Sequence, residues 1–140
     1  MTTMVDNSDG IAVVYPSNWP ENDPEAHCTI IYLGKVDEVA FTEQDVRNAM
    51  ELMQLGAPGE VPVAGPEMFG PDKDIPVVLL EPVPVLTLAK LALEAVLLTF
   101  GIENASEFKD YKPHVTVPDH DREIPTTVTL GEPVLWWGPQ

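Results

Sequence analysis

The sequence predicts an α+β fold in one domain that spans residues 1–140. A chain of 140 residues has the usual size of one domain, and its hydrophobic content of 44% is enough to form a core. Short β-branched segments occur beside two longer segments whose apolar residues recur at helical spacing. The predicted order of elements is therefore β, β, α, β, β, α, β, β, β, after a loose leader at residues 1–10.

The strands are predicted from segments rich in β-branched and aromatic residues and bounded by glycine or proline. They comprise residues 11–15, 27–33, 61–69, 75–80, 112–118 (starting after Pro113), 126–130 and 134–137. The Gly70-Pro71-Asp72 stretch is typical of a turn, so it is expected to join two of these strands in a β-hairpin. In the last strand Trp136 and Trp137 point to opposite faces, which places at least one indole in the core.

Two helices are predicted from apolar residues that recur every three or four positions. Thr42 is expected to cap the first helix, with Asp45 three residues on as in a capping box, and Gly56 and Pro58 are expected to end it. Its apolar positions are Val46, Ala49, Met50 and Met53. The second helix covers 86–100, stops at Gly101 and is expected to be largely buried. The positions at helical spacing are Leu88, Leu91, Ala92, Ala95, Leu98 and Thr99.

The charge balance limits the partners. Seven Lys and Arg against 23 Asp and Glu give a net charge of −16, so long duplex nucleic acid is expected to be repelled.

The N-terminus lacks the pattern of a signal peptide, and the most apolar stretch, 83–100, contains a proline and two charges, so we expect neither export nor a membrane span. A single cysteine, Cys28, cannot form an internal disulfide, which fits a reducing cytoplasm. A monomer without membrane association is expected.

One motif occurs twice, once in each half of the chain. His27-Cys28-Thr29-Ile30 and His114-Val115-Thr116-Val117 share the pattern His, any residue, Thr, aliphatic. On a strand, residues i and i+2 project from the same face, so each motif places an imidazole beside a hydroxyl. Two such strands side by side would form a pocket of four polar groups.

Such a pocket suits a phosphodiester. One neutral imidazole can take a proton from the nucleophile, and the other, protonated, can give a proton to the leaving oxygen. The two threonine hydroxyls can donate to the non-bridging oxygens, and the scheme requires neither metal nor other cofactor. The candidate catalytic residues are His27, Thr29, His114 and Thr116.

With these motifs the chain resembles the 2H phosphoesterases, a family that includes 2',5' RNA ligase-like proteins and cyclic phosphodiesterases, some from phages. HCTIIYLG resembles the first motif strand of the family and YKPHVTV the second. The resemblance implies a bilobal fold, with two pseudo-symmetric halves of antiparallel sheet and flanking helices around a central cleft lined by the four motif residues. It also implies hydrolysis or opening of a phosphodiester that involves a ribose 2' oxygen.

The expected substrate is a small ribonucleotide, because a compact anion can be held locally despite the global charge. It is a 2',3'-cyclic phosphate, a 2',5' linkage or a cyclic oligonucleotide. Phage relatives of this type can destroy cyclic nucleotide defence signals, so an anti-defence role in the host cytoplasm is one specialisation of this hypothesis. Tyr15, Tyr111 and Lys112 are candidate substrate-binding residues, since aromatic rings stack on bases and an ammonium can meet a phosphate. His120 is interpreted as a solvated surface residue.

Three alternatives remain open. The same fold could serve as a nucleotide-binding or protein-interaction module without turnover. An acidic structural protein or DNA mimic would make the two motifs accidental. Zinc binding is disfavoured because His27 and Cys28 are adjacent on a strand and point to opposite faces, and that geometry also argues against Cys28 as a nucleophile.

Overall fold

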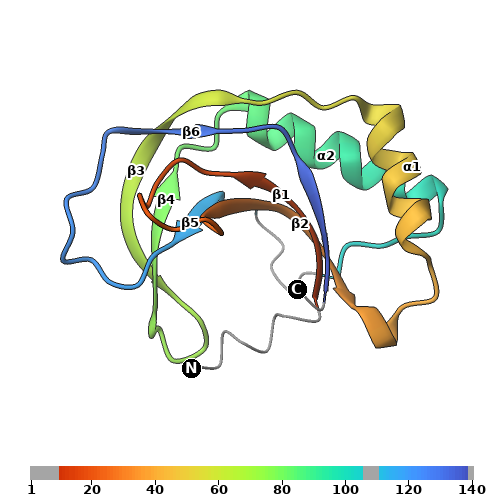
Figure 1. Ribbon diagram of the computed structural model, residues 1–140, viewed down its shortest axis with the longest axis horizontal. Coiled ribbons are helices and arrows are strands. Elements are labelled where there is room, and N and C mark those ends of the chain that lie inside the picture. The colour runs from red at the N-terminus through yellow and green to blue at the C-terminus, as the bar shows by residue number, and fades with distance from the viewer. Residues whose placement is uncertain (1–9, 106–110, 139–140) are drawn as a thin grey trace.

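Within the described residues, 10–105 and 111–138, the computed structural model contains one antiparallel sheet of seven strands and two α-helices (Figure 1). The elements are β1 (Gly10–Pro16), β2 (His27–Lys35), a short 3-10 helix (Val36–Glu38), α1 (Glu43–Met53), β3 (Gly59–Phe69), β4 (Ile75–Leu80), α2 (Pro84–Thr99), β5 (His114–Thr116), β6 (Thr127–Leu130) and β7 (Val134–Trp137). The predicted order of strands and helices and the α+β class are confirmed. Most of the predicted leader lies outside the described residues, and Gly10 already belongs to β1.

The strand order in the sheet is β6-β3-β4-β5-β2-β1-β7. The predicted hairpin is confirmed as β3 and β4, which pair antiparallel. The last two strands lie at opposite ends of this strand order, because β6 pairs with β3 and β7 pairs with β1. The end of β1 also meets β6, where Ser17 bridges Leu130 and the Gly131 N–H donates to the Pro16 carbonyl oxygen at 2.8 Å. The two ends of the strand order therefore approach each other at this bridge, and the sheet is curved, as Figure 1 shows.

The strand predicted at 112–118 is shorter than expected, since β5 covers only His114–Thr116. Proline has no N–H to donate, and Pro113 and Pro118 flank the segment. Pairing nevertheless extends past the strand, because the Pro113 carbonyl accepts from the Leu80 N–H at 2.9 Å. This short strand lies between β4 and β2 in the middle of the sheet.

Helix α1 begins with the predicted capping box. The Thr42 hydroxyl accepts from the Asp45 N–H at 3.2 Å, and the Asp45 carboxylate accepts from the Thr42 N–H at 2.9 Å. Val46 and Ala49 are buried on its inner face. The helix ends earlier than Gly56, because Gln54 adopts a left-handed conformation with φ of 49° and its N–H donates to the Met50 carbonyl.

Helix α2 packs on the opposite side from the one that the sequence predicted. Its buried residues are Leu86, Leu93 and Leu97, whereas the six positions expected to be buried are all exposed. The exposed residues are Leu88, Leu91, Ala92, Ala95, Leu98 and Thr99. Leucines occur at helical spacing on both faces, so spacing alone did not identify the packed one. The glycine stop is confirmed, because Gly101 has φ of +77° and the Ile102 N–H closes the end on the Leu97 carbonyl at 3.0 Å.

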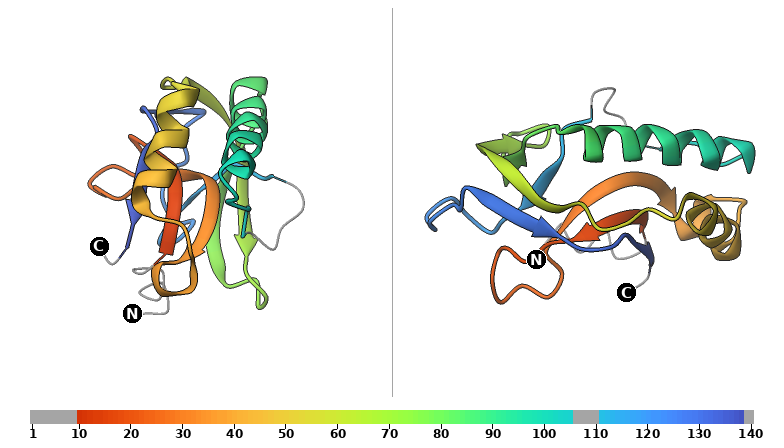
Figure 2. Two further views of the ribbon diagram at one scale, coloured as in Figure 1. Left: turned by 90° about the vertical axis from the view of Figure 1, so that its right-hand side faces the viewer. Right: turned by 90° about the horizontal axis from the view of Figure 1, so that it is seen from above.

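The core lies between the sheet and the helices. Buried side chains of β2, α1 and α2 belong to one apolar cluster that also contains residues of β1, β3, β4, β5 and β6, and Leu135 and Trp137 of β7 pack against it. Figure 2 shows α2 lying along one side of the sheet and leaving its other side uncovered by helices. No helix among the described residues is long and apolar enough to cross a membrane.

The capping box of α1 gives a first test. Thr42→Ala removes the hydroxyl that accepts from the Asp45 N–H, so it is expected to lower the free energy of unfolding by about 1 kcal/mol. Thr42→Ser keeps the hydroxyl and is expected to stay within a few tenths of a kcal/mol of the parent. Urea denaturation followed by circular dichroism measures both, and equal losses in the two variants would contradict the capping role.

Candidate functional site

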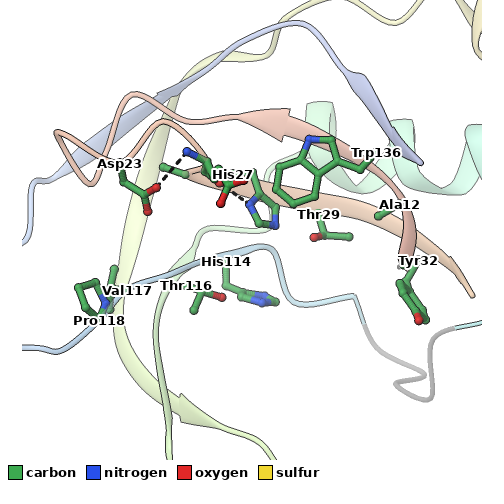
Figure 3. A pocket seen from close by; sticks show the side chains of 13 residues that line it. Ala12, Asp23, His27, Thr29, Tyr32, His114, Thr116, Val117, Pro118 and Trp136 are labelled. Carbon is green, nitrogen blue, oxygen red and sulfur yellow. Dashed lines mark hydrogen bonds between the residues drawn. The ribbon is translucent and has the colours of Figure 1, made fainter. Parts of the chain in front are cut away.

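The two His-x-Thr motifs meet at the centre of the sheet. Strand β2 carries His27 and Thr29, β5 carries His114 and Thr116, and the strands pair antiparallel with Cys28 opposite Val115. In this register each histidine lies across from the threonine of the other strand. All four side chains line one cavity of about 620 Å³, as Figure 3 shows. The structure therefore brings together the four groups that the sequence singled out.

The residues between the histidines and threonines point the other way. Cys28 and Val115 are buried on the helix-covered face and belong to the apolar core. Burial raises the pKa of the Cys28 thiol to about 11, so the thiol stays protonated at neutral pH. Cys28 is therefore buried on the face opposite to His27, as the alternation along the strand predicted. Among residues 10–105 and 111–138 no group of three or more His, Cys, Asp or Glu side chains is placed to hold a metal ion.

Both imidazoles are oriented in the same way. The Nδ1 of His27 lies 2.8 Å from the carbonyl oxygen of Glu25, and the Nδ1 of His114 lies 2.8 Å from the carbonyl oxygen of Lys112. Because a carbonyl oxygen can only accept, Nδ1 of each ring donates and the lone pair of the neutral ring lies on Nε2. Each histidine is thus held by the residue two positions before it, with Nε2 available for proton transfer.

The loop before β2 orders His27. The Asp23 carboxylate accepts from the Glu25 N–H at 2.9 Å, and the Glu25 carbonyl then accepts from His27 (Figure 3). At the base of the loop the Ser17 N–H donates to the Ala26 carbonyl at 2.9 Å. Asp23 and Glu25 also line the cavity, although the sequence indicated only a solvated acidic loop. Among the described lining residues there is no Lys or Arg, so of these side chains only the imidazoles can carry positive charge.

The two histidines differ in their electrostatic surroundings. Burial lowers the pKa of His27 below 6.5, while its hydrogen bond to the Glu25 carbonyl and the carboxylates of Asp23 and Glu25 oppose that shift. Burial also lowers the pKa of His114, the bond to the Lys112 carbonyl opposes it, and the charge of His27 lowers it further. A single proton shared by the pair is therefore expected to reside on His27.

An aromatic ring contacts each imidazole. The indole of Trp136 lies with its ring centre 4.2 Å from that of His27, tilted by 56°. The ring of Phe69 meets His114 edge-on with centres 4.7 Å apart. These contacts restrict the rotation of both imidazoles and bring an indole into the cavity. Trp137 packs against the core instead, which confirms that the two tryptophans occupy opposite faces.

Tyr32 also lines the cavity, and the sequence analysis missed it. Strict alternation along β2 would put Ile31 on the face of His27 and Thr29. A register shift intervenes, because Val13 pairs with Ile31 while Val14 pairs with Thr29, so Ile30 is the extra residue of a bulge. The bulge leaves Ile31 buried and turns Tyr32 to the cavity, and the period-two pattern of the sequence carries no signal for it.

The three expected substrate-binding residues lie elsewhere. The Tyr15 side chain is buried in the apolar core, and this burial raises its pKa to about 12. Tyr111 donates its hydroxyl to the Thr29 carbonyl oxygen at 2.9 Å, beneath the site, so it braces β2 instead of lining the cavity. The Lys112 side chain is exposed and does not line the cavity, although its carbonyl orients His114. The assignment of these side chains to the cavity was wrong.

His120 also differs from the expectation of a solvated surface residue. It is half-buried, and its Nε2 donates to the Val77 carbonyl oxygen at 2.9 Å. This bond ties the loop after β5 to β4.

Searches of protein-family models, curated proteins and solved structures for relatives of this chain find no match.

The lowered pKa values of the histidines predict how stability depends on pH. Each imidazole titrates near 6.5 in the unfolded chain and lower in the folded one, so below pH 6.5 the unfolded chain binds more protons. The contribution of the pair to the free energy of unfolding is therefore fully present above pH 6.5 and is lost as the pH falls through the folded pKa values. Urea unfolding at pH 7.5 and 5.5 should show a larger loss for the parent than for the His27→Asn, His114→Asn double variant. Equal losses in the two proteins would contradict the shifts, because the carboxylates are the same in both.

Proposed function

We propose that this chain is a metal-independent phosphodiesterase of the 2H phosphoesterase type, acting on a small ribonucleotide by two-histidine general acid and base catalysis. One observation carries the proposal: two imidazoles with available Nε2 atoms and two threonine hydroxyls line one cavity of about 620 Å³. A pocket of this size lies within the usual range of about 300–1,000 Å³ for small-molecule sites. The four groups supply a base, an acid and two hydrogen-bond donors.

The local symmetry of the site supports the family assignment. Antiparallel pairing at Cys28 and Val115 relates one His-x-Thr motif to the other by an approximate twofold axis. Strands β1 and β7 lie beyond β2 on one side, and β4, β3 and β6 lie beyond β5 on the other. On this proposal the two sides of the sheet are the two lobes of a 2H phosphoesterase.

The electrostatic difference between the histidines assigns their roles. No carboxylate raises the pKa of His114, so His114 is the neutral base. Its Nε2 takes the proton of the attacking oxygen. The attacking oxygen is the free ribose hydroxyl next to the phosphodiester, which is the 2' hydroxyl in a 3',5' linkage and the 3' hydroxyl in a 2',5' linkage. For a 2',3'-cyclic phosphate it is a water molecule. It forms a new P–O bond, the bond from phosphorus to the leaving oxygen breaks, and protonated His27 gives its proton to that oxygen. Proton exchange with water then restores both histidines.

Thr29 and Thr116 have the positions needed to stabilise the phosphoryl oxygens. Each lies two residues after a histidine on the same strand face, so the hydroxyls flank the space between the imidazoles (Figure 3). Hydroxyl donors strengthen their bonds as negative charge develops on the non-bridging oxygens.

The charge of the protein favours a compact substrate. A net charge of −16 repels a long polyanion over its whole length, whereas a short one is held by donors within a few ångströms. Tyr32 and Trp136 line the cavity and offer aromatic faces for a nucleobase. The candidates are 2',3'-cyclic phosphates, 2',5'-linked dinucleotides and cyclic oligonucleotides, including those that serve as defence signals.

Product analysis tests the proposal directly. The protein is incubated in excess chelator with each substrate class, and the products are identified by mass spectrometry. We expect turnover of at least one class, a loss of about 10²–10⁴ in kcat for His27→Ala or His114→Ala, and a loss of about 10²–10³ for Thr29→Val or Thr116→Val. Thr129→Val, on strand β6 outside the cavity lining, is the matched control and should keep full activity.

Two outcomes would contradict the phosphodiesterase. Stoichiometric retention of a nucleotide without product would favour a binding module with the same cavity. Activity that is unchanged in both His27→Ala and His114→Ala would show that the paired motifs have no chemical role.

The pH dependence of the rate tests the roles of the two histidines. Asn in place of Asp23 keeps an acceptor for the Glu25 N–H but removes the charge that raises the pKa of His27. If His27 is the acid, Asp23→Asn moves the alkaline limb of the pH–kcat/KM profile to lower pH and leaves the acidic limb in place. Asp23→Ala also loses the hydrogen bond, so the rate at the optimum is expected to fall further.

Glu21→Gln is the matched control for this experiment, because Glu21 belongs to the same exposed loop and does not line the cavity. It should leave both limbs unchanged. Movement of the acidic limb in Asp23→Asn would reverse the assignment and make His27 the base.

A further inference from the structure

The outer face of α2 is apolar along its whole length. Val85, Leu88, Leu91 and Leu98 expose 50, 62, 57 and 53% of their surface. Ala92, Ala95 and Thr99 lie exposed among them. Contiguous apolar patches of this kind on soluble proteins commonly mark an interaction site.

The charges of α2 lie away from this face. Lys90 and Glu94 are the only charged residues of the helix, and they form an ion pair with Nζ and Oε1 3.2 Å apart. Their side chains are only 14 and 28% exposed, and Glu94 also accepts from the Asn104 side chain at 3.0 Å. A surface helix normally turns its charges to water and its leucines inward. Here the leucines that point outward have no charged neighbour on their own face of the helix.

This face is remote from the candidate active site. The cavity is lined by strands and by the loops next to them, and no residue of α1 or α2 contributes to it. In Figure 2 α2 lies along the outside of the sheet. An interaction through this face therefore does not depend on the proposed function.

The exposed residues follow the spacing of a helix-pairing seam. Leu88, Leu91, Ala95 and Leu98, which we call the α2 seam, are separated by three, four and three residues. This is the alternation of positions a and d through which two helices pack side by side. We propose that the α2 seam is the interface of a homodimer, in which α2 of one copy packs antiparallel against α2 of a second copy about a twofold axis.

The α2 seam is complementary to itself in this orientation. A twofold axis at the level of residue 93 places Leu88 opposite Leu98 of the second copy and Leu91 opposite its Ala95, and the same contacts recur on the other side. The resulting layers are Leu–Leu, Leu–Ala, Ala–Leu and Leu–Leu. Small residues in the middle layers let the helices approach, and large residues fill the ends.

The area is sufficient for a small dimer. A fully exposed leucine side chain presents on the order of 100 Å² of apolar surface, so the four large side chains on the outer face of α2 expose roughly 200 Å². The exposed Ala92 and Ala95 add to this area. The smallest specific interfaces bury about 600 Å² per partner, of which about 65% is apolar in homodimers. The large side chains of α2 supply more than half of that apolar area, so we expect a dimer at the weak end of specific association. This differs from the monomer expected from the sequence.

The charge of the chain favours a second copy over other occupants and gives the dimer a distinctive salt dependence. The α2 seam offers no carboxylate for a basic protein, and an anionic membrane would repel a chain of charge −16. Two copies of that charge also repel each other, but added salt screens the repulsion while apolar contacts persist. Dimerisation should therefore strengthen with salt, whereas association with a basic partner would weaken.

Sedimentation equilibrium of the full chain tests the proposal. Measurements cover about 1–300 μM protein in 0.05 and 0.5 M NaCl. The average mass should rise with protein concentration from 15.4 kDa towards twice that value, and this rise should begin at a lower protein concentration in 0.5 M NaCl. Leu91→Glu places a charge in the seam of both copies and should weaken dimerisation by about 100-fold or more. Leu52→Glu on α1, where the leucine is 70% exposed but outside the seam, is the matched control and should dimerise like the parent.

A charge pair tests the antiparallel register. Leu88→Lys alone and Leu98→Glu alone should each weaken the dimer. Combined in one chain, the two substitutions place an ammonium at position 88 opposite a carboxylate at position 98 of the second copy, and the twofold axis repeats this pair. The double variant should therefore dimerise more tightly than either single variant. Because all these leucines are exposed, the variants should keep the parental circular dichroism spectrum and, at protein concentrations where the parent is monomeric, its melting temperature.

The following results would overturn the dimer. The parent could stay at 15.4 kDa throughout the concentration range in both salts, or Leu91→Glu could leave the parental dimer intact. Binding of the monomer to phosphatidylcholine vesicles through the seam, without self-association, would assign the face to a lipid surface instead. Absence of recovery in the Leu88→Lys, Leu98→Glu variant would exclude the antiparallel register.

Discussion

The pairing of β2 with β5 is the constraint on which the site depends. It joins residues from the two ends of the chain at one point, Cys28 opposite Val115, and sets both histidines and both threonines on one face. The opposite face of the same two residues is buried in the core against the helices. Core packing therefore determines how far apart the two imidazoles lie, and Tyr111 adds to this by holding the Thr29 carbonyl from beneath. A change in the apolar layer under the sheet would be transmitted to the face that lines the cavity because the interior is closely packed.

The motif residues could be predicted from the sequence because their placement follows from local geometry. His27 and Thr29 must share a face of any regular strand, as must His114 and Thr116. Tyr32 could not be predicted, because a single extra residue at Ile30 reverses the alternation that follows it. The positions of Asp23 and Glu25 at the cavity could not be predicted either, since they depend on how an irregular loop folds back between Ser17 and Ala26. Tyr15 and Tyr111 were misplaced for the related reason that an aromatic residue near a motif fits either face of the sheet.

Helix α2 shows a different limit of the sequence. Its existence, its glycine stop and its approximate length were predictable, but both of its faces carry leucines at helical spacing. Charged residues would normally mark the solvent side, and here Lys90 and Glu94 lie towards the protein as an ion pair. Asn104, which follows the helix, donates to Glu94, and this bond is the main reason that the pKa of that carboxyl lies below its usual value. A tertiary contact thus accommodates the charges on the packed side and leaves the leucines for the outside.

The acidity of the chain and the proposed chemistry on an anionic substrate are compatible once burial is considered. Burial lowers the pKa of both imidazoles, and a pair that was neutral at physiological pH would contain a base but no acid. The Asp23 and Glu25 carboxylates beside His27 oppose that effect on one ring only. They reduce the attraction of the cavity for a phosphate, but they make His27 the more readily protonated of the two rings, which is the property that the proposed acid needs. Two strands related by near symmetry thereby acquire two different histidines, and the difference comes from the loop that precedes only one of them.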